Sequence, residues 1–498
     1  MSLLSAHNLL LAFSAFSLLL LIRLIVALFQ NHAQLRDFKG PSLAAYTRFW
    51  IFKEEVAGRL PHSQRAALKQ YGSPCRIGPN LLLTDDADLI RHMNAPGSRW
   101  TRSSWYEAMK MDPRQDNVFS TRDEKLHAEL KAKEYGGYNS PSIEPLIDSL
   151  TSQLLTLIST HHPSQPFDLS STIRYYVLDV LSTVAFAGPF GFMAQNRDLW
   201  SYQKTSNAFM LLLGLSANHT FFRSLLSHPF MQYLAAPKLT DTTGLGPALK
   251  FAREAVATRF GPHAEKEKEK KDLLGHFVAK GLSQLQCEVE AFLQIAAGSD
   301  STTTVLRSTL FLLASNPIAY AALRAEVDAA VTSGTASRPV IKYTESFRLP
   351  YLQACIWEGA RLYPPLFGLK SKTSPPDGET IKGVYYPPGT EVAICDDAVM
   401  RNPDVFGERV DVFEPERFLV EDEEVRARRL RTVEVVFGSG RFLCLGRGIA
   451  MMEINKAIFE IFKTFDLVVA DPMRGIDMVR HNVHVQSEMN VVAYPRGR

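Results

Sequence analysis

The apolar residues of this chain are concentrated first at its N-terminal end. From Leu3 to Phe29 nearly every residue is apolar, and Arg23 lies near the end of the run. About 20 such residues are enough for a helix to cross the hydrocarbon core of a membrane, and a long basic side chain near its end can reach the headgroups. The run therefore predicts one N-terminal transmembrane helix, a membrane anchor over residues 1–30.

A cleaved signal peptide, with Leu9 to Ile22 as its apolar core, is the alternative interpretation. Such a peptide begins with a basic segment, and no lysine or arginine precedes Arg23, which favours the anchor. The positive-inside rule then leaves the rest of the chain in the cytosol, because basic residues follow the run closely. They are Arg36, Lys39, Arg48 and Lys53.

Beyond the anchor the pattern is mainly helical. Residues 31–45 are predicted to form a hinge or linker, because Pro41 resists helix and biases Gly40 toward extended conformations. From 61 to about 339 apolar positions recur at helical spacing. No proline interrupts residues 282–316, which predicts one unusually long helix.

A different pattern begins near residue 380. Ile381 to Val392 combines β-favouring residues with glycines and prolines, which is typical of short strands joined by tight turns. Helical periodicity returns from Gly446 to Phe465. Residues 46–498 are therefore expected to form one mainly α domain with a small β region.

Charge and cysteine content exclude some classes of function. The 498 residues include 55 basic and 52 acidic side chains, so the net charge of +3 lacks the strongly basic balance typical of nucleic-acid binding. Nucleic acid is not an expected partner. The cysteines are too sparse and irregularly spaced for a disulfide framework or a structural zinc site. They are Cys75, Cys287, Cys355, Cys395 and Cys444.

Cys444 lies in a setting that the other cysteines lack. Glycine allows tight turns and a close approach of the backbone to a flat ligand, and loop amides can stabilise a thiolate. The dipole of a helix that follows favours the same negative charge. Cys444 is therefore a candidate metal ligand, whereas the other cysteines are expected to be buried and inert. The glycines around it are Gly438, Gly440 and Gly446.

The segment from Phe437 to Gly446 resembles the signature of the cytochrome P450 family, the haem-thiolate monooxygenases. The resemblance implies the cytochrome P450 fold, with Cys444 as the axial thiolate ligand of the iron of haem b. Phe442 departs from the family, because a basic residue that pairs with a haem propionate is expected there, and Arg441 is the candidate replacement. The loop residues that the resemblance assigns to haem binding are Phe437, Gly438, Gly440, Arg441 and Gly446.

Glu358 and Arg361 have the Glu-x-x-Arg spacing of a second family motif. Three residues apart on a helix, they share a face and can form a charged pair. Their apolar neighbours imply burial, and a buried pair needs further partners. The resemblance supplies Arg417, in Pro-Glu-Arg-Phe, as the third member. These residues are expected to be structural.

The segment from Ala297 to Thr302, in the middle of the long predicted helix, is similar to the oxygen-activating motif of the family. An acid beside an alcohol can relay protons. Asp300, Ser301 and Thr302 are the catalytic candidates, with Ser301 at the position where the family has threonine.

His127 and Lys131 resemble an aromatic-or-His-x-x-x-basic helix of the family whose side chains hold the haem propionates. Either Lys370 or Lys372 is a further candidate for such a contact. The resemblance covers essentially the whole chain. It is to the fungal branch that includes pisatin demethylase, through the segments Asp116 to Phe119 and Ala297 to Thr302 and the pair Arg441-Phe442.

The resemblance implies a monooxygenase that inserts one atom of dioxygen into a lipophilic small molecule, such as a terpenoid, polyketide or indole alkaloid of fungal secondary metabolism. The chain has no glycine-rich dinucleotide motif followed by a second domain, so electrons from NADPH must come through a separate NADPH-cytochrome P450 reductase. Cytochrome b5 is a further candidate donor. Location in the endoplasmic reticulum membrane, with a cytosolic catalytic domain, follows from the anchor. Arg441, Arg447 and Lys456 are candidates for a basic docking face, with solvated surface as the alternative.

Two other functions stay open at this point. One is a non-catalytic haem sensor or carrier, which would have no need of the acid and alcohol at Asp300 and Ser301. The other is a haem-thiolate isomerase or dehydratase that works without dioxygen.

Overall fold

The computed structural model of the protein describes residue 14 and residues 33–135, 142–261, 272–474 and 476–497. Within these ranges no helix is both long and apolar enough to cross a membrane. The predicted anchor at 1–30 lies, apart from Ser14, outside the described residues.

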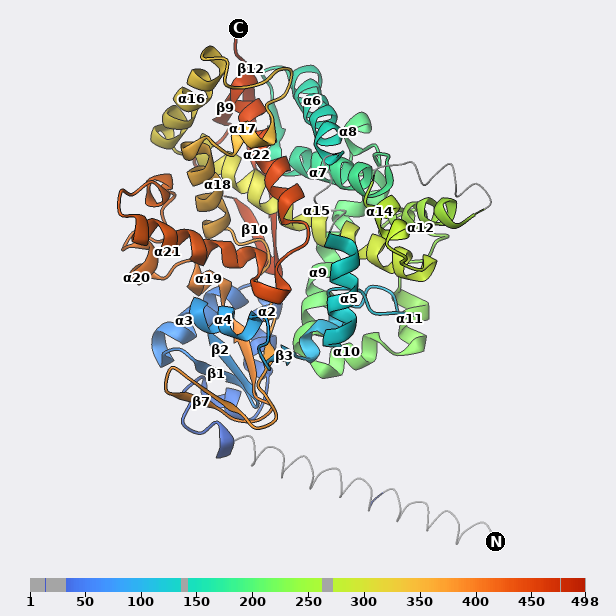
Figure 1. The fold of residues 1–498 in the computed structure, drawn as a ribbon, viewed down its shortest axis with the longest axis vertical. Helices are drawn as coiled ribbons and strands as arrows, with labels where there is room; N and C mark the ends of the chain where they lie inside the picture. The colour runs from blue at the N-terminus through green and yellow to red at the C-terminus, as the bar shows by residue number, and fades with distance from the viewer. Residues whose placement is uncertain (1–13, 15–32, 136–141, 262–271, 475, 498) are drawn as a thin grey trace.

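Helices dominate the body, as the apolar spacing predicted (Figure 1). The N-terminal half contains η1 (Ser42–Ala45), α2 (Phe49–Val56), α3 (Leu60–Tyr71), α4 (Ala87–Asn94), η2 (Ser104–Met109), α5 (Glu124–Tyr135), α6 (Ile143–His161), α7 (Leu169–Phe186), α8 (Phe192–Gln195), α9 (Tyr202–Asn218), α10 (Thr220–Leu226), α11 (Pro229–Ala235) and α12 (Gly246–Phe260). The C-terminal half contains α14 (Leu273–Ala279), α15 (Gln284–Ala314), α16 (Pro317–Thr332), α17 (Tyr343–Ser346), α18 (Pro350–Leu362), α19 (Asp396–Val399), α20 (Pro403–Phe406), η5 (Pro415–Phe418), α21 (Glu423–Val433), η7 (Gly440–Phe442) and α22 (Arg447–Thr464).

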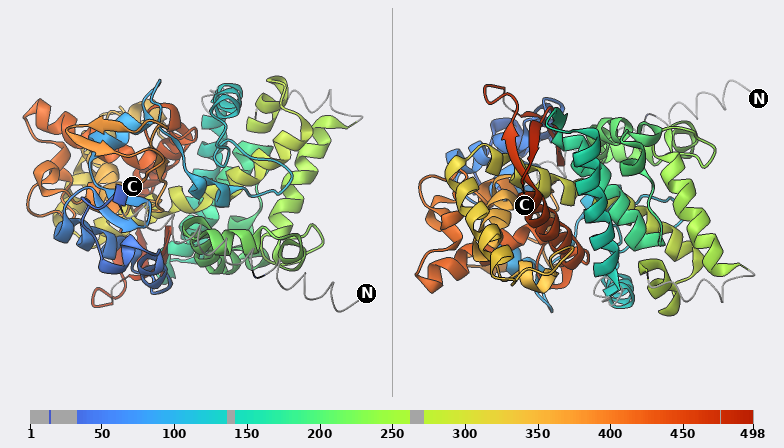
Figure 2. Two further views of the ribbon diagram at one scale, coloured as in Figure 1. Left: turned by 90° about the horizontal axis from the view of Figure 1, so that it is seen from below. Right: turned by 90° about the horizontal axis from the view of Figure 1, so that it is seen from above.

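The long helix predicted within 282–316 is confirmed as α15, which has 31 residues. Ser283 caps its first turn in a reciprocal pair with Gln286, which satisfies amides that have no partner inside the helix. The helix packs against α7, α12, α18 and α22 and runs through the middle of the molecule (Figure 2). Its side chains are therefore buried on most faces, with Ala297 an exposed exception near the centre.

The β region is small, and its main sheet has five strands in the order β1-β2-β8-β5-β3. Its strands are β1 (Cys75–Gly78), β2 (Leu81–Thr84), β3 (Thr101–Arg102), β5 (Lys372–Thr373) and β8 (Glu391–Ile394). In the antiparallel pair of β3 and β5, Arg102 stands opposite Lys372. This register brings two cations together from distant parts of the sequence.

The remaining strands form smaller units, and the strands predicted near residue 380 are confirmed. They are the sheet of β4 (Pro166–Asp168), β12 (Asn490–Pro495) and β9 (Phe465–Val469), the hairpin of β6 (Glu379–Ile381) and β7 (Val384–Tyr386), and the hairpin of β10 (Asp477–His481) and β11 (Val483–Ser487).

The described part of the predicted linker packs against the body. Leu35 is fully buried, and the Arg76 amide of β1 donates to the Lys39 carbonyl at 2.8 Å. A Cβ at Gly40 would lie only 1.9 Å from the Arg76 carbonyl oxygen, so this close backbone contact requires glycine.

Candidate haem-thiolate site

The cysteine loop depends on two of its glycines. Gly438 and Gly440 have φ of 75° and 54°, in the left-handed region that favours glycine. A Cβ at Gly438 would also lie 2.5 Å from the Phe442 carbonyl oxygen. The turn lets the Cys444 amide donate to the Phe437 carbonyl at 2.8 Å. Gly446, by contrast, has an ordinary φ of −77°.

The side chain of Cys444 is exposed, whereas Cys75, Cys287, Cys355 and Cys395 are buried, as expected. Desolvation by the neighbouring protein nevertheless raises the pKa of its thiol. The backbone amides of Gly446 and Arg447, together with the charges of Lys131 and Arg447, act in the opposite direction and favour the thiolate. An accessible sulfur with amides directed toward it suits a metal ligand.

Phe442, the position that departs from the family signature, lies inside a cluster of cations. The Lys372 ammonium is 3.4 Å from the centre of its ring, and the guanidinium carbons of Arg102 and Arg441 are 4.7 and 4.9 Å away. The His127 ring lies beside it, with the ring centres 5.2 Å apart. Cations over an aromatic face are attracted by its quadrupole, so the phenyl ring helps to hold them.

Few carboxylates compensate this positive charge. Arg441 pairs with Glu124 at 3.5 Å, while buried Lys372 donates to the Tyr106 hydroxyl at 3.1 Å. Burial and the charge of Arg102 lower the pKa of Lys372 well below its usual value. In the described part of the chain, Nε of Arg102 and Nε of Arg441 have no hydrogen-bond partner. Buried donors in excess of acceptors fit an anionic group such as a pair of carboxylates.

The other predicted propionate contacts have different surroundings. The Lys131 ammonium donates to the carbonyls of Arg441 and Leu443 at 2.7 and 3.0 Å, and so fixes the cysteine loop. Of the two alternatives near β5, Lys372 faces this loop, while Lys370 pairs with Asp396 at 2.7 Å.

Arg102 was missed by sequence reasoning. Arg102 belongs to a strand of two residues, and its partner strand β5 follows some 270 positions later, so no local pattern marks it.

The side chains of the predicted relay residues on α15 have partners other than one another. Asp300 forms a buried ion pair with Arg174 of α7 at 2.8 Å, and the Ser206 hydroxyl of α9 donates to it at 3.3 Å. Ser301 is partly accessible and donates to the Ala297 carbonyl at 2.8 Å. Thr302 is buried. Among the described residues, no hydrogen bond joins Asp300 to Ser301 or Thr302.

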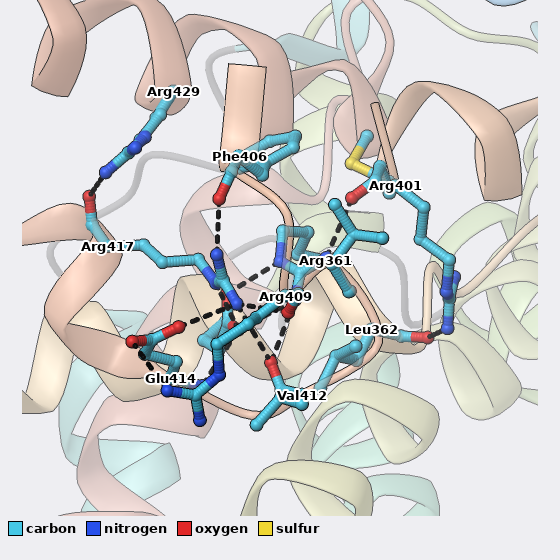
Figure 3. A network of polar contacts seen from close by, with 12 residues as sticks. Arg361, Leu362, Arg401, Phe406, Arg409, Val412, Glu414, Arg417 and Arg429 are labelled. Atoms are coloured by element: carbon cyan, nitrogen blue, oxygen red, sulfur yellow. Dashed lines mark hydrogen bonds and ion pairs between the residues drawn. The ribbon is translucent and has the colours of Figure 1, made fainter. Parts of the chain in front are cut away.

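Glu358 and Arg361 are fully buried on α18 and form a two-pronged pair, with Nε and Nη2 of Arg361 each 2.7 Å from a carboxylate oxygen. Arg417 joins them, with its Nε 3.2 Å from Glu358. Both arginines also donate to backbone carbonyls between Met400 and Val412 (Figure 3). The triad therefore ties the irregular segment before the cysteine loop to α18.

The prediction of a basic docking face is wrong for one of its three residues, Lys456. Lys456 is fully buried, with its ammonium 2.7 Å from Glu144 and 2.6 Å from Asp148. It joins α22 to α6 and is not available to a partner protein. The cause is the apolar environment of α22, whose middle is buried on all faces.

Comparison with known proteins agrees with this arrangement. The family model described as cytochrome P450 matches residues 86–488. Cytochrome P450 monooxygenase ABA1 of Pyricularia oryzae is 38% identical over 475 residues, which cover 92% of each chain. Cytochrome P450 monooxygenase aba1 of Botryotinia fuckeliana is 35% identical over 469 residues, covering 92% of this chain and 91% of its own.

A third relative, cytochrome P450 monooxygenase abl1 of Leptosphaeria maculans, is 31% identical over 481 residues, covering 93% of this chain and 82% of its own. The relatives are fungal monooxygenases, and membership of the family implies a haem with cysteine thiolate ligation. With a family model and full-length relatives in agreement, the chain belongs to the cytochrome P450 family.

Proposed function

We propose that this protein is a membrane-anchored haem-thiolate monooxygenase that hydroxylates or otherwise oxidises a lipophilic small molecule of fungal secondary metabolism. It uses dioxygen and electrons that a separate NADPH-cytochrome P450 reductase, with cytochrome b5 as a second donor, delivers. The observation that carries the proposal is the exposed Cys444. Its sulfur accepts hydrogen bonds from the backbone amides of Gly446 and Arg447, and a cluster of buried cations lies beside its loop.

In this proposal Cys444 would ligate the iron of haem b, and Phe437, Gly438, Gly440 and Gly446 form the loop that presents it. When bound, the haem supplies the site of dioxygen reduction and oxygen transfer, and an axial thiolate favours O–O cleavage. The protein's part is to favour the thiolate form of Cys444 and to hold it in place. The loop amides and Lys131, which anchors two loop carbonyls, serve both needs.

The cations around Phe442 would hold the haem propionates. Lys372 and Arg102 replace the missing basic residue at Phe442, with Arg441 and His127 beside them. Burial and four nearby cations lower the pKa of His127 to about 3, so its imidazole stays neutral and can donate one hydrogen bond. The phenyl ring of Phe442 supports the cations.

In this proposal side chains of α15 deliver the protons. Ser301, partly accessible in the middle of a buried helix, presents an alcohol to the reacting side, and Thr302 is the second candidate. Asp300 must rotate away from Arg174 to serve them, because the ion pair at 2.8 Å holds its carboxylate against α7. Arg174 therefore sets how often Asp300 reaches the alcohols.

The proposed architecture places the anchor at 1–30, a linker at 31–45 and the catalytic domain at 46–498, on the cytosolic face of the endoplasmic reticulum. Exposed apolar side chains support contact with a membrane surface. They lie on η1, α2, α10 and α11 and include Leu43, Phe49, Phe221, Phe230 and Tyr233. Stacking of Phe52 on Phe222, with ring centres 5.9 Å apart, joins α2 to α10, and both lie toward the lower end in Figure 1.

The test is turnover in microsomes that contain the protein and a fungal reductase, supplied with lipophilic metabolites of the source organism and analysed by mass spectrometry. The proposal expects products that depend on NADPH and dioxygen and that gain one oxygen atom or lose two hydrogens. Product formed under anaerobic conditions without NADPH would instead identify an isomerase or dehydratase. Absence of substrate-dependent NADPH consumption across the panel would favour a haem sensor.

A further inference from the structure

A second group of polar side chains is buried where α2, α9, η2 and the turn between β10 and β11 meet. Glu55 of α2 is 1% exposed, and Asn482 of the turn is 5% exposed. Asn218, at the end of α9, donates from Nδ2 to Glu55 Oε2 at 2.9 Å and accepts from Trp105 Nε1 at 3.1 Å. These bonds satisfy one half of the Glu55 carboxyl group and fix its orientation.

The other half of that carboxyl group is unsatisfied. Among the described residues, Glu55 Oε1, Asn482 Nδ2 and His219 Nε2 have no hydrogen-bond partner. A buried polar atom without a partner costs about 1–3 kcal/mol, so such atoms call for an explanation. His219 Nε2 stands 3.9 Å from the satisfied oxygen of Glu55, so the unsatisfied atoms belong to one neighbourhood.

Two of these atoms lie against Gly214 of α9. A Cβ added to Gly214 would lie 2.0 Å from Glu55 Oε1 and 2.9 Å from Asn482 Nδ2. Glycine inside a helix costs about 1 kcal/mol relative to alanine. At this position glycine makes room for the buried acceptor, since Glu55 Oε1 already occupies the place of a Cβ, with the Asn482 donor next to it.

The group also lies next to the cation cluster around Phe442. The indole of Trp105 packs against the ring of Tyr106, with ring centres 5.1 Å apart, and the Tyr106 hydroxyl accepts from Lys372 in the cation cluster. On the other side, the Phe367 amide donates to the Asn482 carbonyl at 2.9 Å. A Cβ at Gly368 would lie 2.5 Å from Trp105 and 2.7 Å from Asn482, so these walls are closely packed.

We propose that Glu55 and Asn482 form a polar subsite above Gly214 that binds a hydroxyl group of an otherwise apolar substrate. The hydroxyl donates to Glu55 Oε1 and accepts from Asn482 Nδ2, which satisfies both atoms at once. A carboxylate would meet the Glu55 oxygen as a like charge, and an ammonium would offer Asn482 Nδ2 no acceptor. The inference rests on the proposed function and specifies its substrate class as a lipophilic alcohol.

The test compares alcohols with their methyl ethers, which retain the oxygen but have no hydrogen to donate. Farnesol, geraniol and tryptophol, each with its methyl ether, are titrated against the full-length haem-loaded protein, and the spectral shift of the haem reports binding. Burial raises the pKa of Glu55 to about 7, so the titration is run at pH 8, where its carboxylate accepts. At least one alcohol is expected to bind about tenfold more tightly than its ether, as one hydrogen bond to a charged group predicts.

Two variants test whether the preference for the alcohol over its ether arises at Glu55 and Asn482. Gly214→Ala places a methyl group against Glu55 Oε1 and Asn482 Nδ2 and displaces them from each other's neighbourhood. Asn482→Gly removes the donor while keeping the left-handed backbone, since φ is 60° at Asn482. Either change should reduce the preference for the alcohol to less than about twofold. Gly188→Ala is the matched control, because nothing lies within 4 Å of a Cβ there, and it should keep the full preference.

The outcomes separate the subsite from the proposed function. A ferrous carbon-monoxide band of thiolate ligation, without any alcohol preference, overturns the subsite alone. A preference that survives both Gly214→Ala and Asn482→Gly also overturns the subsite and leaves the proposed function intact. Loss of the band in the parent protein overturns the proposed function instead. If Gly214→Ala fails to fold, Asn482→Gly decides the question.

Discussion

Replacing Glu358 by glutamine tests how the cysteine side of the fold is held together. Glu358 is fully buried and accepts from Arg361 twice at 2.7 Å, from Arg417 at 3.2 Å and from the Glu414 amide at 2.9 Å. Glutamine has the same shape, but it carries no charge and turns a donor toward one of the guanidinium groups. Two buried arginines then lose the carboxylate that they share.

The expected loss follows from burial. Removing one partner of a buried ion pair leaves an uncompensated charge and costs about 3–5 kcal/mol. The whole stability of a folded domain is about 5–15 kcal/mol, so Glu358→Gln removes a large part of it. Because Arg361 and Arg417 also fix the carbonyls of the segment before the cysteine loop, haem retention should fall with stability.

The assay is urea unfolding of the haem-loaded protein, followed by circular dichroism and by haem absorbance. Glu254→Gln is the control, since Glu254 forms an exposed pair with Lys250 four residues away at 3.8 Å. Such surface pairs contribute less than about 0.5 kcal/mol. A loss of less than about 1 kcal/mol in Glu358→Gln, or a loss equal to that of the control, would refute the reasoning.

Three further predictions address separate parts of the site. Asp300→Asn should keep the carbon-monoxide band and slow product formation by about 100-fold, the size of a general acid–base contribution; unchanged turnover would exclude Asp300 from proton delivery. Lys372→Met should lower haem content after gel filtration, because the propionates lose a buried cation, and an unchanged content would contradict its role. Burial raises the pKa of Glu55 from 4.5 to about 7, so the folded state keeps this proton where the unfolded chain releases it. The free energy of unfolding should therefore fall by about 3 kcal/mol as pH rises from about 4.5 to about 7, and Glu55→Gln should remove this fall. If the free energies of unfolding of the two proteins depend on pH in the same way, Glu55 is not a buried carboxyl group with a raised pKa.

The parts of the fold that the sequence predicts are those carried by local patterns. The long apolar run without proline predicts α15, and the glycines around Cys444 predict a tight loop that the positive φ of Gly438 and Gly440 confirms. Glu358 and Arg361 lie three residues apart on one helix, so their pairing needs no knowledge of the tertiary structure.

The parts that the sequence cannot predict depend on pairing between distant segments. Arg102 meets Lys372 only through the register of two very short strands. The Asp300 carboxylate turns toward α7 because Arg174 is there, which no spacing within 297–302 reveals. Lys456 looks like surface charge in the sequence, and only the packing of α22 on α6 buries it.

Haem-thiolate ligation by Cys444 is tested most directly by the carbon-monoxide spectrum of Cys444→Ala. The cations around Phe442 remain in that variant, so some haem should still bind through its propionates, which keeps the spectrum measurable. The prediction is that the ferrous carbon-monoxide band characteristic of thiolate ligation, present in the parent protein, is absent from the variant. A variant that binds haem and keeps this band would show that another residue is the ligand.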